Sequence, residues 1–321
     1  MDYYSFESFN ITQYIEPCQG KRLDDLFRNQ TIIQNDMGEF LELIWTEDQF
    51  PQEFSFQRTK VGLYRNLKTV YNIGKHTEKK MRKRGVRSLY ELRTNLRFRN
   101  AASEIIEQIQ SKDFKALCKN RYIYDLDVSF CFNLEDFLFL DVETLGIYDS
   151  PIIILGIGYF RNKKFIIRIF FAREIEEEIA ICEHFKNFIL PRFKCFVTYN
   201  GKSFDIPYIA NRMMYYFDKN PMISDDDAPY RKSNTLFHHI DLYHNCRRRY
   251  KGLLSNYTLT TIEKYLLNME RENDLPGNLV SFFYQKYLEK PQKYVGLIKE
   301  CIEHNYWDIY SMPLLYQKLL M

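Results

Sequence analysis

Two acidic residues at the end of an apolar run are the most chemically suggestive feature of the sequence. Asp141 and Glu143 follow the apolar residues 137–140, a run that is typical of a buried strand. Because side chains alternate along a strand, both carboxylates would lie on one face at its end. Paired carboxylates resist ionising together, and a divalent cation bound between them relieves that repulsion. The pattern predicts a metal site, and the alternative is a strand end with two solvated acids.

A second segment places another acid after a strand. Segment 194–199 predicts a strand, and Gly201 directly after it permits a tight turn. Pro207 suits the first turn of a helix, so Asp205 would lie between a strand end and a helix start. Taken alone, Asp205 is most simply an acid at the start of a helix.

The C-terminal region combines a histidine with an acid. His304 and Asp308 are four residues apart, a spacing that places both side chains on one face of a helix. With an ordinary pKa of about 6.5, a histidine suits the role of a base near neutral pH. The alternative is a surface or packing histidine.

The elements around these residues follow a familiar order. Three successive strands with short links predict an antiparallel meander, which a helix, a fourth strand and another helix follow. The expected strands are 137–144, 151–160, 165–171 and 194–199, and the expected first helix is 174–190. This is the order of an RNase H-like core. We therefore expect an α/β fold, an RNase H-like mixed sheet flanked by helices, with a smaller, basic and mainly helical N-terminal domain.

Together the acidic motifs resemble those of the DnaQ-like (DEDD) 3′-to-5′ exonuclease superfamily. Its first motif is similar to Asp141-x-Glu143 and its second to segment 200–207. Its third motif, an Asp on a helix preceded by Tyr or His, is similar to segment 304–308. Further segments resemble its YprB-like RNase H-like branch, namely 240–243, 257–263 and 275–277. The likeness covers roughly residues 68–321.

The resemblance implies a metal-dependent nuclease that hydrolyses phosphodiester bonds of DNA or RNA. Its expected activity is that of a 3′-to-5′ exonuclease with a two-metal mechanism. The two ions would be Mg²⁺ or Mn²⁺, which accept an all-oxygen set of ligands. The catalytic, metal-binding residues that it implies are Asp141, Glu143, Asp205 and Asp308.

Three further residues complete the expected site. His304 would orient or deprotonate the attacking water, although it departs from the usual spacing of the family. The branch with His has four residues between the His and the Asp, whereas this chain has three between His304 and Asp308, as in the branch with Tyr. Asn200 of the second motif is expected to contact the nucleic acid. Asp241 ends another apolar strand and could support the four acids or join them.

A strongly basic segment precedes the acidic motifs. From Arg58 to Arg99 the sequence has fourteen Lys or Arg residues and two acids, which gives this window a charge of +12. The whole chain carries only +3, so the remainder carries −9. A basic part joined to an acidic part suits a protein that grips a polyanion with one and binds cations with the other.

Residues 67–99 within this segment resemble a helix-hairpin-helix motif, whose turn reads Gly-Ile-Gly before a helix. Asn72 replaces the first glycine, and Asn tolerates a positive φ better than most residues. Backbone N–H groups at such a turn hold a phosphate without reading sequence. The expected nucleic-acid contacts are Gly74, Lys75, Lys79, Arg82, Lys83 and, from the later basic run 247–251, Arg247. The alternatives are a hairpin used only for packing and an exposed helix end.

The remaining features bound the class of protein. We place a domain boundary near residue 133, between an N-terminal domain over 1–133 and an RNase H-like exonuclease domain over 134–321. Apart from a half-buried strand pattern at 39–45, residues 1–57 carry no recognisable chemistry. Seven scattered cysteines without a Cys-x-x-Cys pair disfavour structural zinc and a disulfide framework. The absence of a signal peptide and of a run of about 20 apolar residues predicts a cytoplasmic protein without a membrane partner.

Two other functions fit the same residues. One is a non-catalytic nucleic-acid-binding or scaffold module with an exonuclease-like fold, and the other is a structure-specific endonuclease. A decayed nuclease would have lost carboxylates, whereas all four are present, which favours catalysis. The choice between DNA and RNA, the strandedness of the substrate, the oligomeric state and any protein partner stay open.

Overall fold

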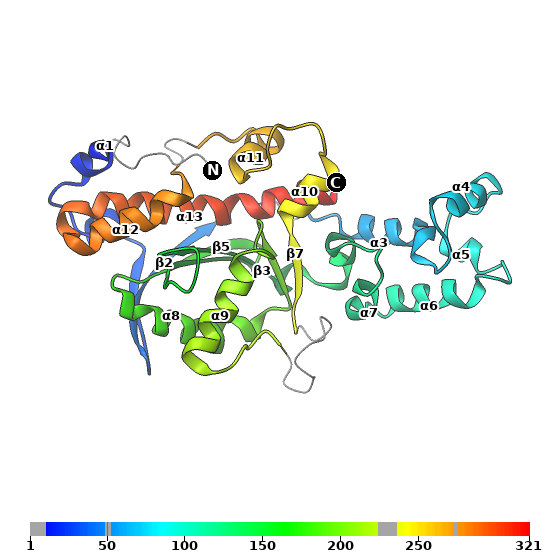
Figure 1. Cartoon of the computed structure of the whole chain (residues 1–321), viewed down its shortest axis with the longest axis horizontal. Coiled ribbons are helices and arrows are strands. Elements are labelled where there is room, and N and C mark those ends of the chain that lie inside the picture. Colours follow the sequence, from blue (N-terminus) through cyan, green and yellow to red (C-terminus); the bar gives the residue numbers. More distant parts are fainter. Residues whose placement is uncertain (1–10, 49, 51–52, 224–235, 272–274) are drawn as a thin grey trace.

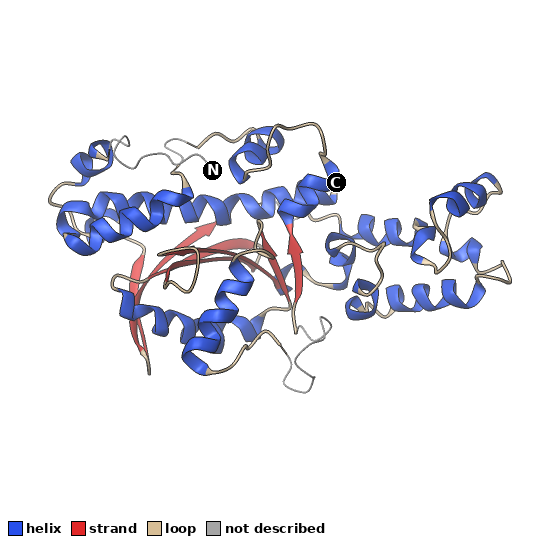
Figure 2. Ribbon diagram, in the orientation of Figure 1, coloured by secondary structure: helices blue, strands red, loops and turns tan. Residues whose placement is uncertain are grey.

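The computed structural model describes residues 11–48, 50, 53–223, 236–271 and 275–321. Among these residues a mixed sheet of seven strands has the order β1-β2-β5-β4-β3-β6-β7, with helices on both faces (Figures 1 and 2). This architecture confirms the expected RNase H-like α/β fold. Its strands are β1 (Gln30–Asn35), β2 (Gly38–Glu47), β3 (Phe137–Thr144), β4 (Ile152–Arg161), β5 (Lys164–Phe171), β6 (Cys195–Thr198) and β7 (His238–Asp241).

Strand β3 lies inside the sheet and is buried because both of its faces are apolar. Phe137 and Phe139 belong to the core on one side, whereas Leu138 and Leu140 belong to the core on the other. β3 pairs antiparallel with β4, and β4 with β5, which confirms the expected meander. β6 lies parallel to β3, and β7 to β6, so the carboxyl ends of these three strands meet at the same end of the sheet.

Helices cover the two faces of the sheet (Figure 1). On one face lie α8 (Glu178–His184) and α9 (Asp205–Phe217). On the other lie α12 (Val280–Glu289) and α13 (Pro291–Leu320), with α10 (Leu242–Arg249) and α11 (Leu259–Leu267) packed against α13. Within the described ranges, every helix is too short or too polar to span a lipid bilayer.

Two glycines of β4 allow α13 to lie close to the sheet. A Cβ on Gly156 would lie 2.0 Å from Oδ1 of Asn305, and one on Gly158 would lie 2.7 Å from Ile309. Both contacts are shorter than packed atoms allow, so any larger residue would push the helix away. The glycines therefore set the distance between α13 and the strands beneath it.

The basic segment forms a separate helical module, which extends from the right side of the molecule in Figure 1. Its helices enclose a small apolar core of their own, which includes Leu63, Leu89 and Ile106. They are α3 (Phe56–Arg65), α4 (Lys75–Lys83), α5 (Leu89–Leu92), α6 (Arg99–Gln110) and α7 (Phe114–Cys118). The 3₁₀ segment Asp125–Cys131 then leads back to β3.

The structure corrects the extent of the expected N-terminal domain over 1–133. Residues 30–47 do not join the helical module, because β2 pairs antiparallel with β5 and extends the central sheet. Phe40 and Leu43 of β2 are fully buried. The sequence pattern predicts this strand, but pairing across more than a hundred residues leaves no local signal. The helical module is thus an insertion between two strands of one sheet.

Candidate active site

The first two acids lie at the end of β3, as the sequence predicts. Asp141 and Glu143 share the face of β3 that carries Phe137 and Phe139, the face on which α13 packs. Asp141 stands opposite Gly156 in the pairing of β3 with β4. Its carboxylate therefore lies where the glycine lets α13 come closest.

Asp205 reaches the same place from the opposite face of the sheet. It is the first residue of α9, and its Oδ1 accepts a hydrogen bond of 3.0 Å from the N–H of Val142, the residue between the two acids of β3. The turn before it requires glycine, because a Cβ on Gly201 would lie 2.4 Å from Oγ1 of Thr198 and 2.8 Å from Oδ2 of Asp205.

Helix α13 supplies the remaining residues. Nε2 of His304 lies 3.5 Å from Oδ2 of Asp308 and 3.7 Å from Oε1 of Glu143. Asn305, the next residue along α13 after His304, donates a hydrogen bond of 2.8 Å from Nδ2 to Oδ2 of Asp141. The expected one-face arrangement of His304 and Asp308 thus faces the two acids of β3.

The acids of this cluster have raised pKa values, because they are buried close to one another with too few positive charges nearby to balance them. Burial raises the pKa of Asp141 and of Glu143 well above the usual range, and the nearby carboxylates of Asp308 and Asp205 raise both further. Burial also raises the pKa of Asp205 to about 7, although its hydrogen bond from Val142 acts in the opposite direction. The site therefore favours either protons or an added cation.

The donor set fits a divalent cation. Glu143, His304 and Asp308 each offer an atom that lies within 4.8 Å of the other two. The buried carboxylates of Asp141 and Asp205 are close enough to interact with Asp308 electrostatically. Hard oxygen donors of this kind are preferred by Mg²⁺ and Mn²⁺.

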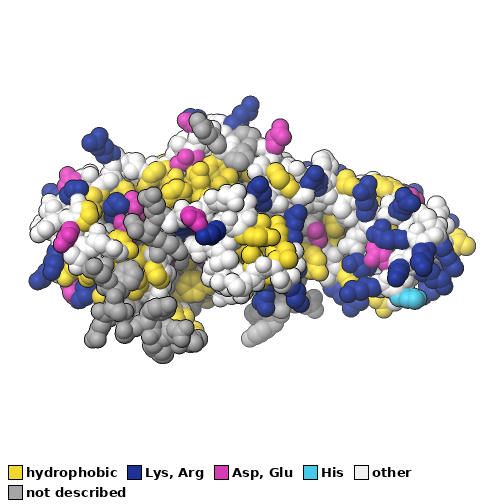
Figure 3. Space-filling model, turned by 90° about the horizontal axis from the view of Figure 1, so that it is seen from above, with side chains coloured by type: hydrophobic (Ala, Val, Ile, Leu, Met, Phe, Trp, Pro, Cys, Tyr) yellow, Lys and Arg dark blue, Asp and Glu magenta, His cyan; other side chains and the backbone are white. Residues whose placement is uncertain are grey.

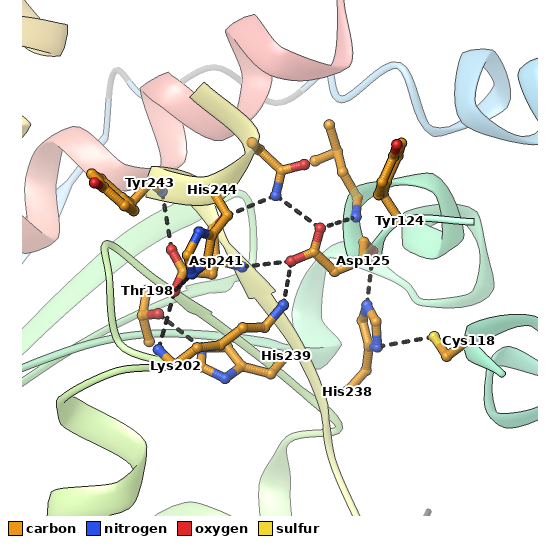
Figure 4. Close-up of polar contacts among 12 residues, drawn as sticks. Cys118, Tyr124, Asp125, Thr198, Lys202, His238, His239, Asp241, Tyr243 and His244 are labelled. Carbon is orange, nitrogen blue, oxygen red and sulfur yellow. Dashed lines mark hydrogen bonds and ion pairs between the residues drawn. The ribbon is translucent and has the colours of Figure 1, made fainter. Parts of the chain in front are cut away.

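Asp241 supports the turn that carries Asp205 (Figure 4). It is fully buried, and its carboxylate accepts hydrogen bonds from the N–H groups of Asn200 at 3.0 Å and Lys202 at 3.1 Å. It also caps α10 through the N–H of Tyr243. Asn200 itself is exposed and has a φ of +66°. Asp241 therefore acts on the site by holding the loop before α9.

Asp125 links the same turn to the chain that returns from the helical module (Figure 4). Its side chain pairs with Lys202 and accepts hydrogen bonds from the N–H of Asp241 at 3.1 Å and from Asn245 at 2.9 Å. Burial acts to raise the pKa of Asp125, but Lys202 and these hydrogen bonds lower it to about 2. Sequence reasoning missed this residue, since its partners come from two segments that are distant from it in the chain.

A buried ion-pair chain next to Asp308 was also missed. Arg271 pairs with both Asp308 and Glu263, and all three side chains are largely excluded from solvent. Burial alone would lower the pKa of Arg271, whereas the two acids raise it above its ordinary value. The sequence carries no spacing signal for Arg271, although Glu263 lies in one of the segments that resemble the YprB-like branch.

Some of the expected nucleic-acid contacts are exposed to solvent, whereas others already pair with groups of the protein. Asn72 adopts a φ of +66°, and Gly74 precedes α4, whose residues Lys75, Lys79 and Lys83 are exposed. Figure 3 shows Lys and Arg side chains gathered over this end of the molecule.

Unlike the exposed lysines of α4, Arg82 and one arginine of the later basic run pair with other groups of the protein. Arg82 pairs with Glu78 at 2.8 Å and donates to the carbonyl of Arg65 at 2.7 Å, so much of its hydrogen-bonding capacity is used within the module. In the later run, Arg248 pairs with Asp125 at 3.1 Å, whereas Arg247 is exposed. Arg247 thus keeps the exposure that a phosphate contact requires.

A mixed sheet with acids from β3, α9 and α13 gathered at one end defines an RNase H-like protein. A family model described as RNase_H superfamily matches residues 138–320, and the chain belongs to this superfamily. It is also 27% identical over 188 residues to the uncharacterized protein YprB of Bacillus subtilis (strain 168). That match covers 58% of this chain but only 42% of YprB, and it supports the YprB-like branch. RNase H-like nucleases commonly use divalent metal ions, and Glu143, His304 and Asp308 form a group that could hold one.

Proposed function

We propose that this protein is a metal-dependent 3′-to-5′ exonuclease acting on DNA or RNA. The observation that carries the proposal is the convergence of four carboxylates from three separate elements. Asp141 and Glu143 come from β3, Asp205 from α9 and Asp308 from α13. Packing four acids against a sheet is costly unless cations are bound, and phosphodiester hydrolysis is chemistry that such cations support.

The four carboxylates would hold two Mg²⁺ or Mn²⁺ ions. When bound, such a pair activates water and stabilises the leaving oxygen of an in-line displacement. Asn305 keeps the carboxylate of Asp141 oriented through its hydrogen bond at 2.8 Å. Nε2 of His304 faces the same acids, where a neutral imidazole can accept a proton from the attacking water.

The helical module would hold the substrate. Lys75, Lys79 and Lys83 lie four residues apart on α4, so they form one basic stripe suited to a phosphate backbone. The turn at Asn72 and Gly74 supports the same role, since α4 begins without a side-chain cap and a helix N-terminus favours a phosphate. Contacts of this kind carry no sequence preference.

The deciding experiment follows strands of DNA and RNA labelled at either end, with Mg²⁺, Mn²⁺ or EDTA. We expect progressive shortening from the 3′ end with metal, and none with EDTA or in Asp141→Asn. A matched control is Asp136→Asn, because Asp136 pairs with Lys194 outside the site at 2.7 Å.

Two outcomes would replace this proposal. Rapid nicking of a closed single-stranded circle would identify an endonuclease instead. Binding of labelled strands with no metal-dependent cleavage of any substrate would identify a non-catalytic nucleic-acid-binding module.

A further inference from the structure

Arg271 connects the acidic site to α11 through its guanidinium group. Its Nε donates to Oε2 of Glu263 at 2.8 Å, and its Nη2 pairs with the other oxygen of Glu263. Its Nη1 lies 2.6 Å from Oδ1 of Asp308. One edge of the planar group is thus fixed on α11, while the remaining nitrogen reaches α13.

The fold brings these residues together by a turn after α11. Asn268 ends that helix with a φ of +53°, which reverses the chain and returns Arg271 to the side of Glu263. Glu263 is fully buried and only 5% of the Arg271 side chain is exposed. A buried pair of this kind holds its geometry, because separation would leave a charge without a partner or water.

The two oxygens of Asp308 are used differently. Oδ1 is taken by Arg271, whereas Oδ2 faces Nε2 of His304 at 3.5 Å. Because Glu263 balances the charge of Arg271, the pair is close to neutral as a unit. Its main effect on a nearby cation is therefore the orientation of Asp308 rather than repulsion.

We propose that Arg271 is a positioning residue that, held by Glu263, fixes Asp308 so that its Oδ2 alone is presented to a divalent cation. The inference rests on the proposed metal-dependent function and extends it to residues outside the acidic motifs. A ligating carboxylate with such a partner keeps one orientation, and loss of the partner typically lowers metal affinity 10- to 100-fold.

The test measures Mn²⁺ binding by calorimetry on the full chain without nucleic acid. The single change Arg271→Met would leave Glu263 buried without its partner, so the main variant combines Arg271→Met with Glu263→Leu. An apolar pair can replace a buried ion pair with little loss of stability. We expect the double variant to stay folded and to bind Mn²⁺ roughly 10- to 100-fold more weakly than wild type.

A second variant separates geometry from charge and guards against loss of folding. Arg271→Lys keeps a cation beside Glu263, but a single ammonium cannot bridge two carboxylates as the planar guanidinium does. We expect Mn²⁺ affinity to fall here as well. The matched control is Lys299→Met, which removes a cation of α13 that pairs with Glu303 at 2.7 Å and not with Asp308.

The outcomes distinguish this inference from the proposed function. Wild-type Mn²⁺ affinity in either Arg271 variant overturns the role of Arg271 and leaves the metal site standing. Absence of Mn²⁺ binding by the wild-type protein overturns both. Weaker binding in both Arg271 variants, with unchanged binding in Lys299→Met, supports the inference even if no cleavage is found.

Discussion

At the scale of single residues, the acidic site is an arrangement of charges that the folded chain does not balance by itself. Asp141 and Glu143 are surrounded by other carboxylates, and Asn305 offers Asp141 only a neutral hydrogen bond. Arg271 is a buried cation beside this cluster, and it is shared with Glu263. Proton and metal binding should therefore compete for the same oxygens.

This competition predicts a pH-dependent stability. Burial raises the pKa of Asp205 to about 7, and it raises those of Asp141 and Glu143 well above their usual range. Groups with raised pKa values stabilise the fold in the protonated form, so their contribution is complete below about pH 4 and is lost as the pH rises through 7.

The melting temperature of the metal-free protein should thus fall by about 5 °C between pH 5 and pH 8 relative to that of Asp141→Asn. The comparison with this variant cancels the buried His184, His238 and His239, whose lowered pKa values act in the opposite sense. Added Mn²⁺ should restore the melting temperature more at pH 8 than at pH 5, and Asp141→Asn should reduce the slope. Thermal melts in EDTA and in Mn²⁺ check this. A melting temperature that does not change with pH relative to Asp141→Asn, in the absence of metal, would contradict the burial of ionisable acids in this site.

At the scale of the elements, the site depends on how closely α13 lies on the sheet. Gly156 of β4 stands opposite Asp141 and beneath Asn305, so one glycine governs both the helix and the carboxylate. Gly201 likewise permits the close turn before α9, which allows Asp205 to return toward β3. Gly156 and Gly201 thus shape the site although neither can ionise or bind a metal through a side chain.

Gly156→Ala should therefore weaken the site without touching a ligand. Its Cβ would lie 2.0 Å from Oδ1 of Asn305, so α13 or the side chain must move. We expect a loss of about 1–3 kcal/mol in the free energy of unfolding and weaker Mn²⁺ binding. Gly277→Ala is the control, because nothing lies within 4 Å of its added Cβ. Denaturant unfolding and calorimetry measure the two effects, and equal behaviour of both variants would rule out the close-packing argument.

At the scale of the whole molecule, a basic module and an acidic site are joined by a short, well-connected link. Asp125 holds Lys202 beside the turn of the second motif, and Arg248 of α10 pairs with the same acid at 3.1 Å. The N-terminal strands complete the sheet on its other side through β2 and β5. The helical module is therefore anchored to the sheet at the turn that leads to Asp205.

The basic stripe on α4 should provide most of the salt dependence of nucleic-acid binding. Reversing Lys75, Lys79 and Lys83 to Glu should lower the slope of log affinity against log salt by roughly 2–3 on duplex DNA, at about 0.9 for each phosphate contact. The control is the pair Lys290→Glu and Lys293→Glu, exposed at the far end of α13. Fluorescence anisotropy over a range of salt measures both, and an unchanged slope would exclude these lysines of α4 from the phosphate contacts.

The sequence by itself determined the features that arise from local periodicity. Alternation along residues 137–144 placed Asp141 and Glu143 on one face, and a separation of four residues placed His304 and Asp308 on one helix face. The strands of the meander follow from short apolar runs with turns between them. These properties depend on near neighbours in the chain, so they are readable without a fold.

Only the tertiary structure decided which distant segments meet. Pairing of β2 with β5 placed the N-terminal strands in the central sheet, although the sequence suggested that residues 1–133 form a separate domain. The links from Arg271 to Asp308 and from Asp125 to Lys202 join segments 37 and 77 residues apart, by the difference of their numbers. Such contacts follow from the packing of whole elements, because no local pattern in the chain encodes a partner at that distance.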